Sequence, residues 1–296
     1  MERIFTYLIE KEDQGQTVEQ YLRNRGYSRK VLVKLRKTVM GLTVNQELVY
    51  TTRSLQAGET LVVKLTEENS SEHVVPVPMK LDILYEDEDL MVINKPAGVP
   101  IHPSQGNYDN TLANGIACYF QEQGQQFVCR VINRLDRNTT GLLIVSKNML
   151  SACILSDMMA ARQIHRQYLA IVNGILEGEG TVDAPIARSA DSTIERQVDL
   201  IRGERAVTHY RALEQRNGYT LVQLQLETGR THQIRVHMTY LGHPLPGDFL
   251  YNPKDHAMSR QALHSWKLSF CHPITKVPME FTEPMPEDMK QLFLKG

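Results

Sequence analysis

The sequence predicts an α+β fold, in which a small α+β N-terminal unit precedes a larger domain built on a mixed, mostly antiparallel sheet. Three observations predict it. The chain has 296 residues, enough for about two domains at roughly 100–200 residues each. A polar, proline-containing stretch interrupts it at residues 66–80. Beyond that stretch, short apolar runs typical of strands alternate with a few helical patterns, as in α+β domains.

Composition excludes several classes of protein. Hydrophobic residues make up 42% of the chain and charged residues 23%, which favours a folded, water-soluble protein. With a formal net charge of −1, only local basic patches could attract nucleic acid. The four cysteines form no C-x-x-C pair, so neither a disulfide framework nor a zinc site is expected, and a reducing cytoplasm fits. Neither a signal peptide nor a membrane span is expected.

The interruption at residues 66–80 predicts a linker. Its first half is polar without apolar periodicity, and Pro76 and Pro78 favour extended backbone. The predicted division is an N-terminal unit at residues 1–68, a linker at 69–80 and a second domain at 81–296.

The N-terminal unit is expected to contain two helices and short strands. Thr17 is a predicted N-cap, with Gln20 at the capping-box position. Ser28 begins a second helix that runs to residue 37, and strands are expected at 42–44 and 61–65. The second helix carries five basic side chains: Arg29, Lys30, Lys34, Arg36 and Lys37.

In the second domain, one helix is expected over residues 147–164, amphipathic with Leu150, Ile154 and Met158 on its apolar face together with Ala161. Another is expected from Thr231, as N-cap, to Leu241, ending at Gly242. Strands are expected at residues 89–94, 141–146, 167–172 and 219–227.

Residues 134–141 place Asp136 between Arg134 and Arg137, in a turn that leads into a buried strand. A charged surface turn is the commoner meaning of such a pattern. The alternative is functional, because neighbouring guanidinium groups would hold the Asp136 carboxylate in its ionised form.

Residues 228–237 contain a second polar cluster at the start of a helix, a place that attracts anions. Ile234 and Met238 would pack inward, with Arg235 at the edge of their stripe. His232 and His237 are five residues apart and diverge on a helix, so no metal site is predicted.

Tyr168 alternates with Ala170 and Val172 on one face of a predicted strand. A core tyrosine with a satisfied hydroxyl is the commoner explanation. An aromatic platform for a base turned out of an RNA stack is the functional one.

Together these segments, in this order, resemble the RluA family of pseudouridine synthases, over nearly the whole second domain. Each piece alone has low specificity, whereas the four in order are specific. The matching pieces are residues 84–98 with His102 and Pro103 (opening motif), 134–141 (catalytic motif, H-R-L-D-x-x-T-S-G), 168–170 with Gly174 (tyrosine strand), and 229–237 with Gly247, Asp248 and Tyr251 (last motif).

The N-terminal unit resembles the RNA-binding module first seen in ribosomal protein S-four. Residues 28–37 are similar to its basic second helix. Val44 and Asn45 match its following strand, and Gly58 and Glu59 match its closing turn. The resemblance implies that this helix and strand face RNA.

Three positions depart from the family pattern. Asn133 and Thr140 stand where the family usually has His and Ser, and Arg166 replaces a common Lys. None of the three touches the predicted carboxylate. Asn133 is the change expected to alter packing or RNA contact near the loop.

The resemblance implies an isomerase that converts uridine in RNA to pseudouridine without a cofactor or a metal ion. Asp136 is then the catalytic carboxylate, acting as nucleophile or as base. Arg235 is its ion-pair partner, and Tyr168 stacks on the uracil. The residues expected to contact RNA are Arg134, Arg137, Arg166 and Arg230, with Arg29, Lys30, Lys34, Arg36 and Lys37.

The expected partner is RNA, with large-subunit ribosomal RNA favoured over transfer RNA. A cytoplasmic monomer is the accompanying expectation. Two alternatives stay open at this point: a non-catalytic RNA-binding or ribosome-assembly protein, and a nucleoside hydrolase, which would need a second carboxylate or metal ligands.

Overall fold

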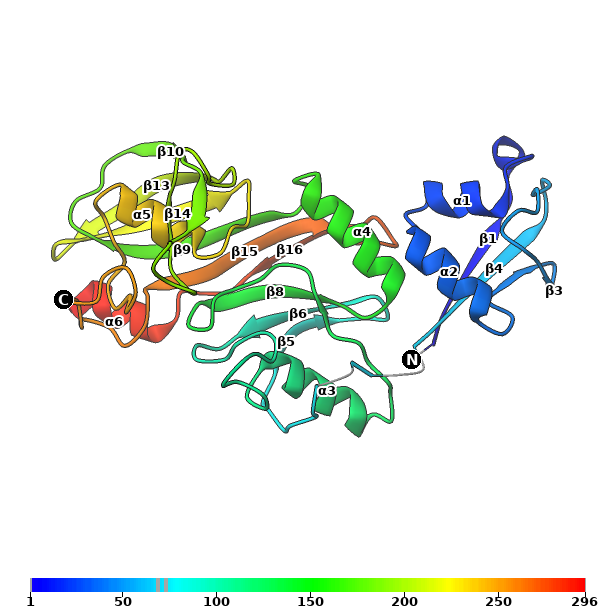
Figure 1. Cartoon of the computed structure of the whole chain (residues 1–296), viewed down its shortest axis with the longest axis horizontal. Coiled ribbons are helices and arrows are strands. Elements are labelled where there is room, and N and C mark those ends of the chain that lie inside the picture. The colour runs from blue at the N-terminus through cyan, green and yellow to red at the C-terminus, as the bar shows by residue number, and fades with distance from the viewer. Residues whose placement is uncertain (1, 68–69, 72–73, 296) are drawn as a thin grey trace.

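The computed structural model describes residues 2–67, 70–71 and 74–295, with the side chain of residue 295 left out. It is an α+β protein with a small N-terminal unit beside a larger body (Figure 1). Residues 69, 72 and 73 of the predicted linker lie outside the described residues. Residues 70–71 and 74–80 form neither helix nor strand.

The N-terminal unit pairs four antiparallel strands in the order β1-β4-β2-β3. The predicted caps of its helices are confirmed. Thr17 and Gln20 form a capping box at α1, and the Ser28 side chain accepts a hydrogen bond from the backbone of Val31 at α2. The elements are β1 (Glu2–Leu8), a 3-10 turn (Lys11–Asp13), α1 (Val18–Asn24), α2 (Arg29–Lys37), β2 (Leu42–Val44), β3 (Glu47–Leu48) and β4 (Thr60–Thr66).

The larger body is built on a ten-stranded sheet in the order β10-β13-β14-β9-β15-β8-β6-β5, with β16 also on β15 and β7 also on β8. All its pairs are antiparallel except β8 with β15, which confirms the mostly antiparallel prediction. The strands are β5 (Asp82–Glu86), β6 (Leu90–Lys95), β7 (Arg130–Val131), β8 (Thr140–Ser146), β9 (His165–Asn173), β10 (Glu179–Asp183), β13 (Val207–Arg216), β14 (Tyr219–Leu226), β15 (Leu263–Cys271) and β16 (Pro278–Thr282), with a separate hairpin of β11 (Ile186–Arg188) and β12 (Arg196–Val198).

Helices cover both faces of this sheet. α3 (Leu112–Glu122) packs on one face, in a core that includes Ile93 and Leu143, and α5 (Gln233–Tyr240) belongs to the same core and lies next to β13. α4 (Met149–Ala160) and α6 (Glu287–Lys295) pack on the other, α4 against Val92 and Ile144 and α6 against Ile171. Because β6 and β8 are buried on both faces, their sequences are continuous apolar runs. None of the helices in the described part of the chain has the length and apolar character needed to cross a bilayer.

α4 differs from the prediction in length and in character. It spans twelve residues and is capped by the Asn148 side chain. Leu150 is buried in the core of the N-terminal unit, and Ile154 packs against that core. Leu155, on the opposite side, is buried in the core under the main sheet. The amphipathic prediction is therefore wrong, because α4 lies between two cores and is apolar on both sides (Figure 1).

Charged groups also join the N-terminal unit to the body. Arg3 donates from Nε and Nη2 to the two carboxylate oxygens of Asp89, at 3.1 and 3.0 Å. Asp89 is only 3% exposed and also accepts a hydrogen bond from Asn148 at 2.8 Å. Arg130 forms a second contact with Glu67 at 2.8 Å. The two parts of the chain thus share a core and a buried ion pair.

Candidate active site

A small cavity opens where the loop before β8, strand β9 and the start of α5 meet. Three of its lining residues are the predicted catalytic set, brought together from segments up to 99 residues apart. The polar and charged side chains that line it include Arg134, Asp136, Tyr168, Arg230, His232 and Arg235.

Arg235 links two carboxylates at the floor of this site. Its Nη1 donates to Oδ2 of Asp136 at 3.0 Å, and its Nε and Nη2 donate to Asp248 at 2.7 and 2.8 Å. Burial opposes the charged guanidinium, but the pairs with Asp248 and Asp136 together raise the pKa of Arg235. The Asp136 side chain remains 24% exposed, so a fixed positive charge holds a carboxylate that substrate can still reach.

Asp248 is a site residue that reasoning from the sequence did not single out. It is fully buried and also accepts hydrogen bonds from the backbone of Leu250 and Tyr251, at 3.0 and 3.2 Å. Gly247 before it has φ of 67°, and a Cβ there would lie 2.4 Å from the carbonyl oxygen of Arg260. Only glycine fits this approach. The resemblance alone had marked Gly247 and Asp248, without showing their partners.

Lys95 is a second residue that the sequence analysis did not assign. Its ammonium is fully buried and donates to the carbonyl oxygens of Pro96, Val99 and Arg137 at 2.7, 3.0 and 2.9 Å. Burial lowers the pKa of Lys95 to about 7, against the opposing effect of the Asp136 charge. Three carbonyl acceptors need three N–H donors, which only the ammonium form supplies. Lys95 therefore ties the loop that carries Asp136 to the end of β6.

Tyr168 lies at the cavity and in the core at once. It is 3% exposed and shares a buried face of β9 with Ala170 and Val172, as predicted. Burial raises the pKa of Tyr168, so its hydroxyl stays protonated. One part of the ring is therefore held by core packing while another borders the cavity.

The start of α5 corrects the predicted cap. Thr231 does not cap this helix; His232 is the N-cap, with a left-handed backbone (φ 59°) and no capping hydrogen bond from its side chain. The Thr231 hydroxyl instead accepts a hydrogen bond from Arg134 at 3.2 Å. Gln233 orders the turn, because its side-chain oxygen accepts from the backbone of Arg230 at 2.9 Å. Gly242 ends the helix region with φ of 82°, as predicted.

Arg235 itself is more deeply buried than its predicted place at the edge of the apolar stripe, because Asp248 neutralises it inside the protein. Arg166 is also buried, at 7% exposed. It packs beneath Gly229 and donates to the Thr228 carbonyl at 3.4 Å. Its side chain thus lies below the surface, whereas an RNA contact requires an exposed group.

The other predicted RNA contacts lie at the surface or near it. Arg137 is exposed and donates to the Gly98 carbonyl at 3.0 Å, and Arg230 is exposed and pairs with Glu204. On α2, Arg36 pairs with Glu19 at 2.9 Å. Arg134, Arg29, Lys30 and Lys37 are exposed, and Lys34 is half-buried.

Two of the departures from the family pattern have clear partners. Asn133 is buried; its Nδ2 donates to the Leu142 carbonyl at 3.2 Å, and its Oδ1 accepts from the Ile144 backbone at 2.8 Å. Its side chain therefore supports β8. Thr140 lies 2.8 Å from Nδ1 of His264, and Nε2 of that ring lies 3.0 Å from the Glu283 carbonyl. Nε2 must carry the hydrogen, so Thr140 donates to Nδ1.

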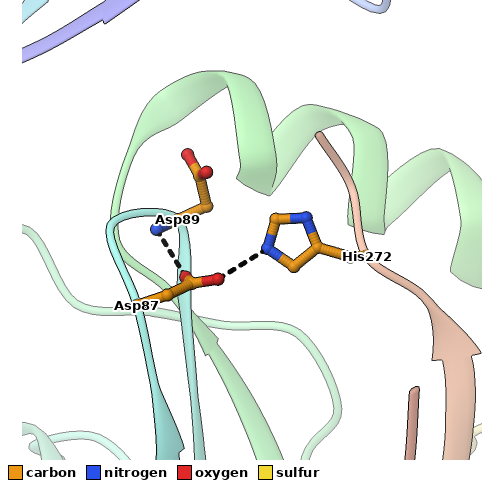
Figure 2. Close-up of side chains that lie close together, drawn as sticks. All are labelled: Asp87, Asp89 and His272. Carbon is orange, nitrogen blue, oxygen red and sulfur yellow. Dashed lines mark hydrogen bonds and ion pairs between the residues drawn. The ribbon is translucent and has the colours of Figure 1, made fainter. Parts of the chain in front are cut away.

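Among the described residues, Asp87, Asp89 and His272 have the spacing of metal ligands. Their ligand atoms are already occupied by hydrogen bonds, of which Figure 2 shows the two that Asp87 accepts, from His272 and from the backbone N–H of Asp89. His272 Nδ1 accepts backbone N–H groups at 3.2 and 3.0 Å, so its Nε2–H donates to Asp87 at 2.8 Å. Asp89 accepts from Arg3. A cation would have to displace these donors, so the cluster does not fit a metal and serves to join the chain segments.

A sequence profile of the RNA pseudouridylate synthase family matches residues 89–240. An uncharacterized RNA pseudouridine synthase of Bacillus subtilis, YjbO, is 44% identical over 95% of this chain and 99% of its own. A ribosomal large subunit pseudouridine synthase D of Zymomonas mobilis is 44% identical over 75% of this chain and 74% of its own.

The solved structure of human RNA pseudouridylate synthase domain containing 1 superposes with a TM-score of 0.58 at 28% identity, over 69% of this chain and 83% of that one. The similarity in sequence extends over almost the whole chain, and the structural similarity covers the greater part of it. The chain therefore belongs to the RNA pseudouridylate synthase family and is an isomerase that converts uridine in RNA to pseudouridine.

Proposed function

We propose that Asp136, Tyr168 and Arg235 carry out this isomerisation. The observation that supports the assignment best is the bridge by Arg235, which holds the partly exposed Asp136 at one end and the buried Asp248 at the other. A guanidinium fixed in this way keeps the catalytic carboxylate aimed into the cavity without competing for substrate.

The reaction breaks the bond between ribose C1′ and uracil N1, turns the base, and forms a bond between C1′ and C5. The C5 proton is lost and N1 gains a proton, so the product is an isomer of the substrate. Asp136 acts on the ribose, and both attack on C1′ and removal of a ribose proton require its ionised form. Uracil leaves as a delocalised anion, which accounts for a site with one reactive carboxylate.

Tyr168 stacks against the uracil and retains it while it turns. The exposed guanidinium groups of Arg134, Arg137 and Arg230 surround or adjoin the cavity and bind the backbone of the RNA strand that carries the target nucleotide. Arg166, because it is buried, orders the turn at Gly229 instead.

The preferred substrate is large-subunit ribosomal RNA. Support comes from relatives named for that subunit, such as the Zymomonas mobilis protein. Residues 1–68 act as an S-four-like RNA-binding domain, joined by a linker at 69–80 to the catalytic domain at 81–296. The basic side chains of α2 are mostly exposed and available to phosphate. The protein acts in the cytoplasm as a monomer.

Pseudouridine mapping tests the proposal. Ribosomal and transfer RNA would be mapped from cells that lack this protein, complemented with wild type or with Asp136→Asn, which removes the charge but keeps the shape. We expect one or a few large-subunit sites to disappear and to return only with wild type.

The other outcomes separate the alternatives. Restoration of the sites by Asp136→Asn refutes the role of Asp136. Loss of sites in transfer RNA alone refutes the ribosomal substrate. Release of free uracil by the purified enzyme would identify a hydrolase. An unchanged map in the absence of the protein would favour a non-catalytic binder.

A further inference from the structure

His232 occupies a strained position at the wall of the catalytic cavity. Its φ of 59° lies in the left-handed region, which costs a residue other than glycine about 1–3 kcal/mol and is found disproportionately at functional sites. Its side chain makes no capping hydrogen bond to α5. It is 15% exposed and lines the cavity beside Asp136. Helix formation therefore does not explain why a histidine is held here.

A short chain of hydrogen bonds fixes which ring nitrogen of His232 carries the hydrogen. The Tyr251 hydroxyl oxygen accepts from the backbone N–H of Arg196 at 2.9 Å, and the same hydroxyl lies 2.9 Å from Nδ1 of His232. Burial raises the pKa of Tyr251 to about 12, so the phenol keeps its proton. Among the described residues, Nδ1 is the acceptor within hydrogen-bond distance of that proton, so we assign the hydrogen of the neutral ring to Nε2.

The Nε2–H group has no hydrogen-bond partner among the residues that the structure describes. Its nitrogen lies 4.0 Å from Oδ2 of Asp136, which is too long for a hydrogen bond. No other acceptor in the described part of the chain lies within bonding distance of it. Burial lowers the pKa of His232, against the raising effect of Asp136, so the ring is a neutral donor beside the catalytic carboxylate.

We propose that His232 is a further catalytic residue, whose Nε2–H donates a hydrogen bond to the O2 carbonyl of the target uracil. The inference rests on the proposed role of Asp136 at ribose C1′. Only N1 and C2 separate C1′ from O2, so a donor next to the Asp136 carboxylate is within reach of that oxygen. When the base leaves, negative charge spreads onto O2, and a fixed donor stabilises it there most strongly.

Two substitutions at this position separate the donor from the backbone strain. His232→Gln places an amide N–H close to the position of Nε2, whereas the shorter side chain of His232→Asn reaches only the position of Nδ1. Asparagine tolerates the left-handed backbone better than glutamine. If relief of backbone strain alone mattered, His232→Asn would be the faster variant. If the proposed hydrogen-bond donor matters, His232→Gln is the faster variant.

The assay is single-turnover pseudouridine formation on RNA from cells lacking the protein, which contains the unmodified target whichever RNA it is. We expect His232→Asn to lose about 100-fold in rate, as for removal of one donor to a developing oxyanion. His232→Gln should stay within about tenfold of wild type. RNA affinity should stay near wild type in both, and the melting temperature of His232→Asn should be no lower than that of His232→Gln. A rate for Asn equal to or above that of Gln overturns the proposal.

Tyr251→Phe provides an independent test that keeps the ring under Arg235. Without the phenolic proton, the hydrogen of His232 is free to shift to Nδ1, and the rate should fall about tenfold in the wild-type background. In the His232→Gln background the same change should have no further effect, and additive losses overturn the proposal. Asp136→Asn is assayed in the same experiment. Activity retained by Asp136→Asn would refute the role of Asp136. The comparison of His232→Gln with His232→Asn tests the role of His232 separately.

Discussion

Replacing Asp248 with asparagine removes one negative charge beneath Arg235 and leaves the shape of the side chain unchanged. Arg235 donates to Asp248 Oδ2 from Nε at 2.7 Å and to Oδ1 from Nη2 at 2.8 Å, while Oδ1 also accepts two backbone N–H groups. In either orientation of the new side chain, its amide NH₂ group faces a donor. Breaking a buried pair on one side costs about 3–5 kcal/mol, so we expect the free energy of unfolding to fall by about 3 kcal/mol.

The same substitution should slow catalysis, although Asp248 does not line the cavity, because Arg235 loses one of its two anchors. We expect a loss of at least about tenfold in the single-turnover rate, equivalent to about 1.4 kcal/mol. Urea unfolding and single-turnover kinetics measure the two effects. Glu59→Gln is the matched control: it breaks a bidentate pair with the partly exposed Arg53 and should cost about 1 kcal/mol or less. An unfolding free energy and a rate within error of wild type would refute the reasoning for Asp248.

Three further substitutions test other features. Lys95→Met removes the donors that hold the loop of Asp136 and should lower the single-turnover rate at least about tenfold with RNA affinity kept; an unchanged rate contradicts this. Arg3→Met leaves the buried Asp89 without its cation and should lower unfolding free energy by about 3 kcal/mol in urea; an unchanged midpoint contradicts this. Burial lowers the pKa of His237, so it opposes folding as pH falls below its unfolded pKa of about 6.5. Stability of His237→Gln should therefore fall less steeply than that of wild type from pH 7 to pH 5, and parallel curves contradict this.

Local signals predicted local structure well. The capping box at Thr17 and Gln20 depends on residues three apart, and it is present. The buried runs that form β6 and β8 were visible because both faces of these strands are covered. The start of α5 was misplaced by one residue, because the side chain of Gln233 and not a Thr231 cap orders that turn.

Contacts between residues far apart in the sequence limited how much of the site could be predicted. The resemblance marked Asp136 and Arg235, but the contact between them spans 99 positions. No spacing in the sequence joins Lys95 to the Arg137 carbonyl or His232 to Tyr251, since these contacts form only when separate loops meet in the fold. The burial of Arg235 could not be predicted for the same reason. Helical periodicity places this charged residue at the edge of the apolar stripe, and it is fully buried because Asp248 pairs with it.

The two apolar sides of α4 make the N-terminal unit difficult to lose during evolution. Removal of residues 1–68 would expose Leu150 and Ile154 together with Ile274, and an uncovered apolar patch of this kind favours aggregation. A lineage that discards the unit must therefore also acquire polar side chains at these positions. Among relatives, apolar residues at the positions equivalent to Leu150 and Ile154 therefore indicate an N-terminal unit that packs on α4. Polar residues at these positions indicate that the unit is absent or is attached without packing on this helix.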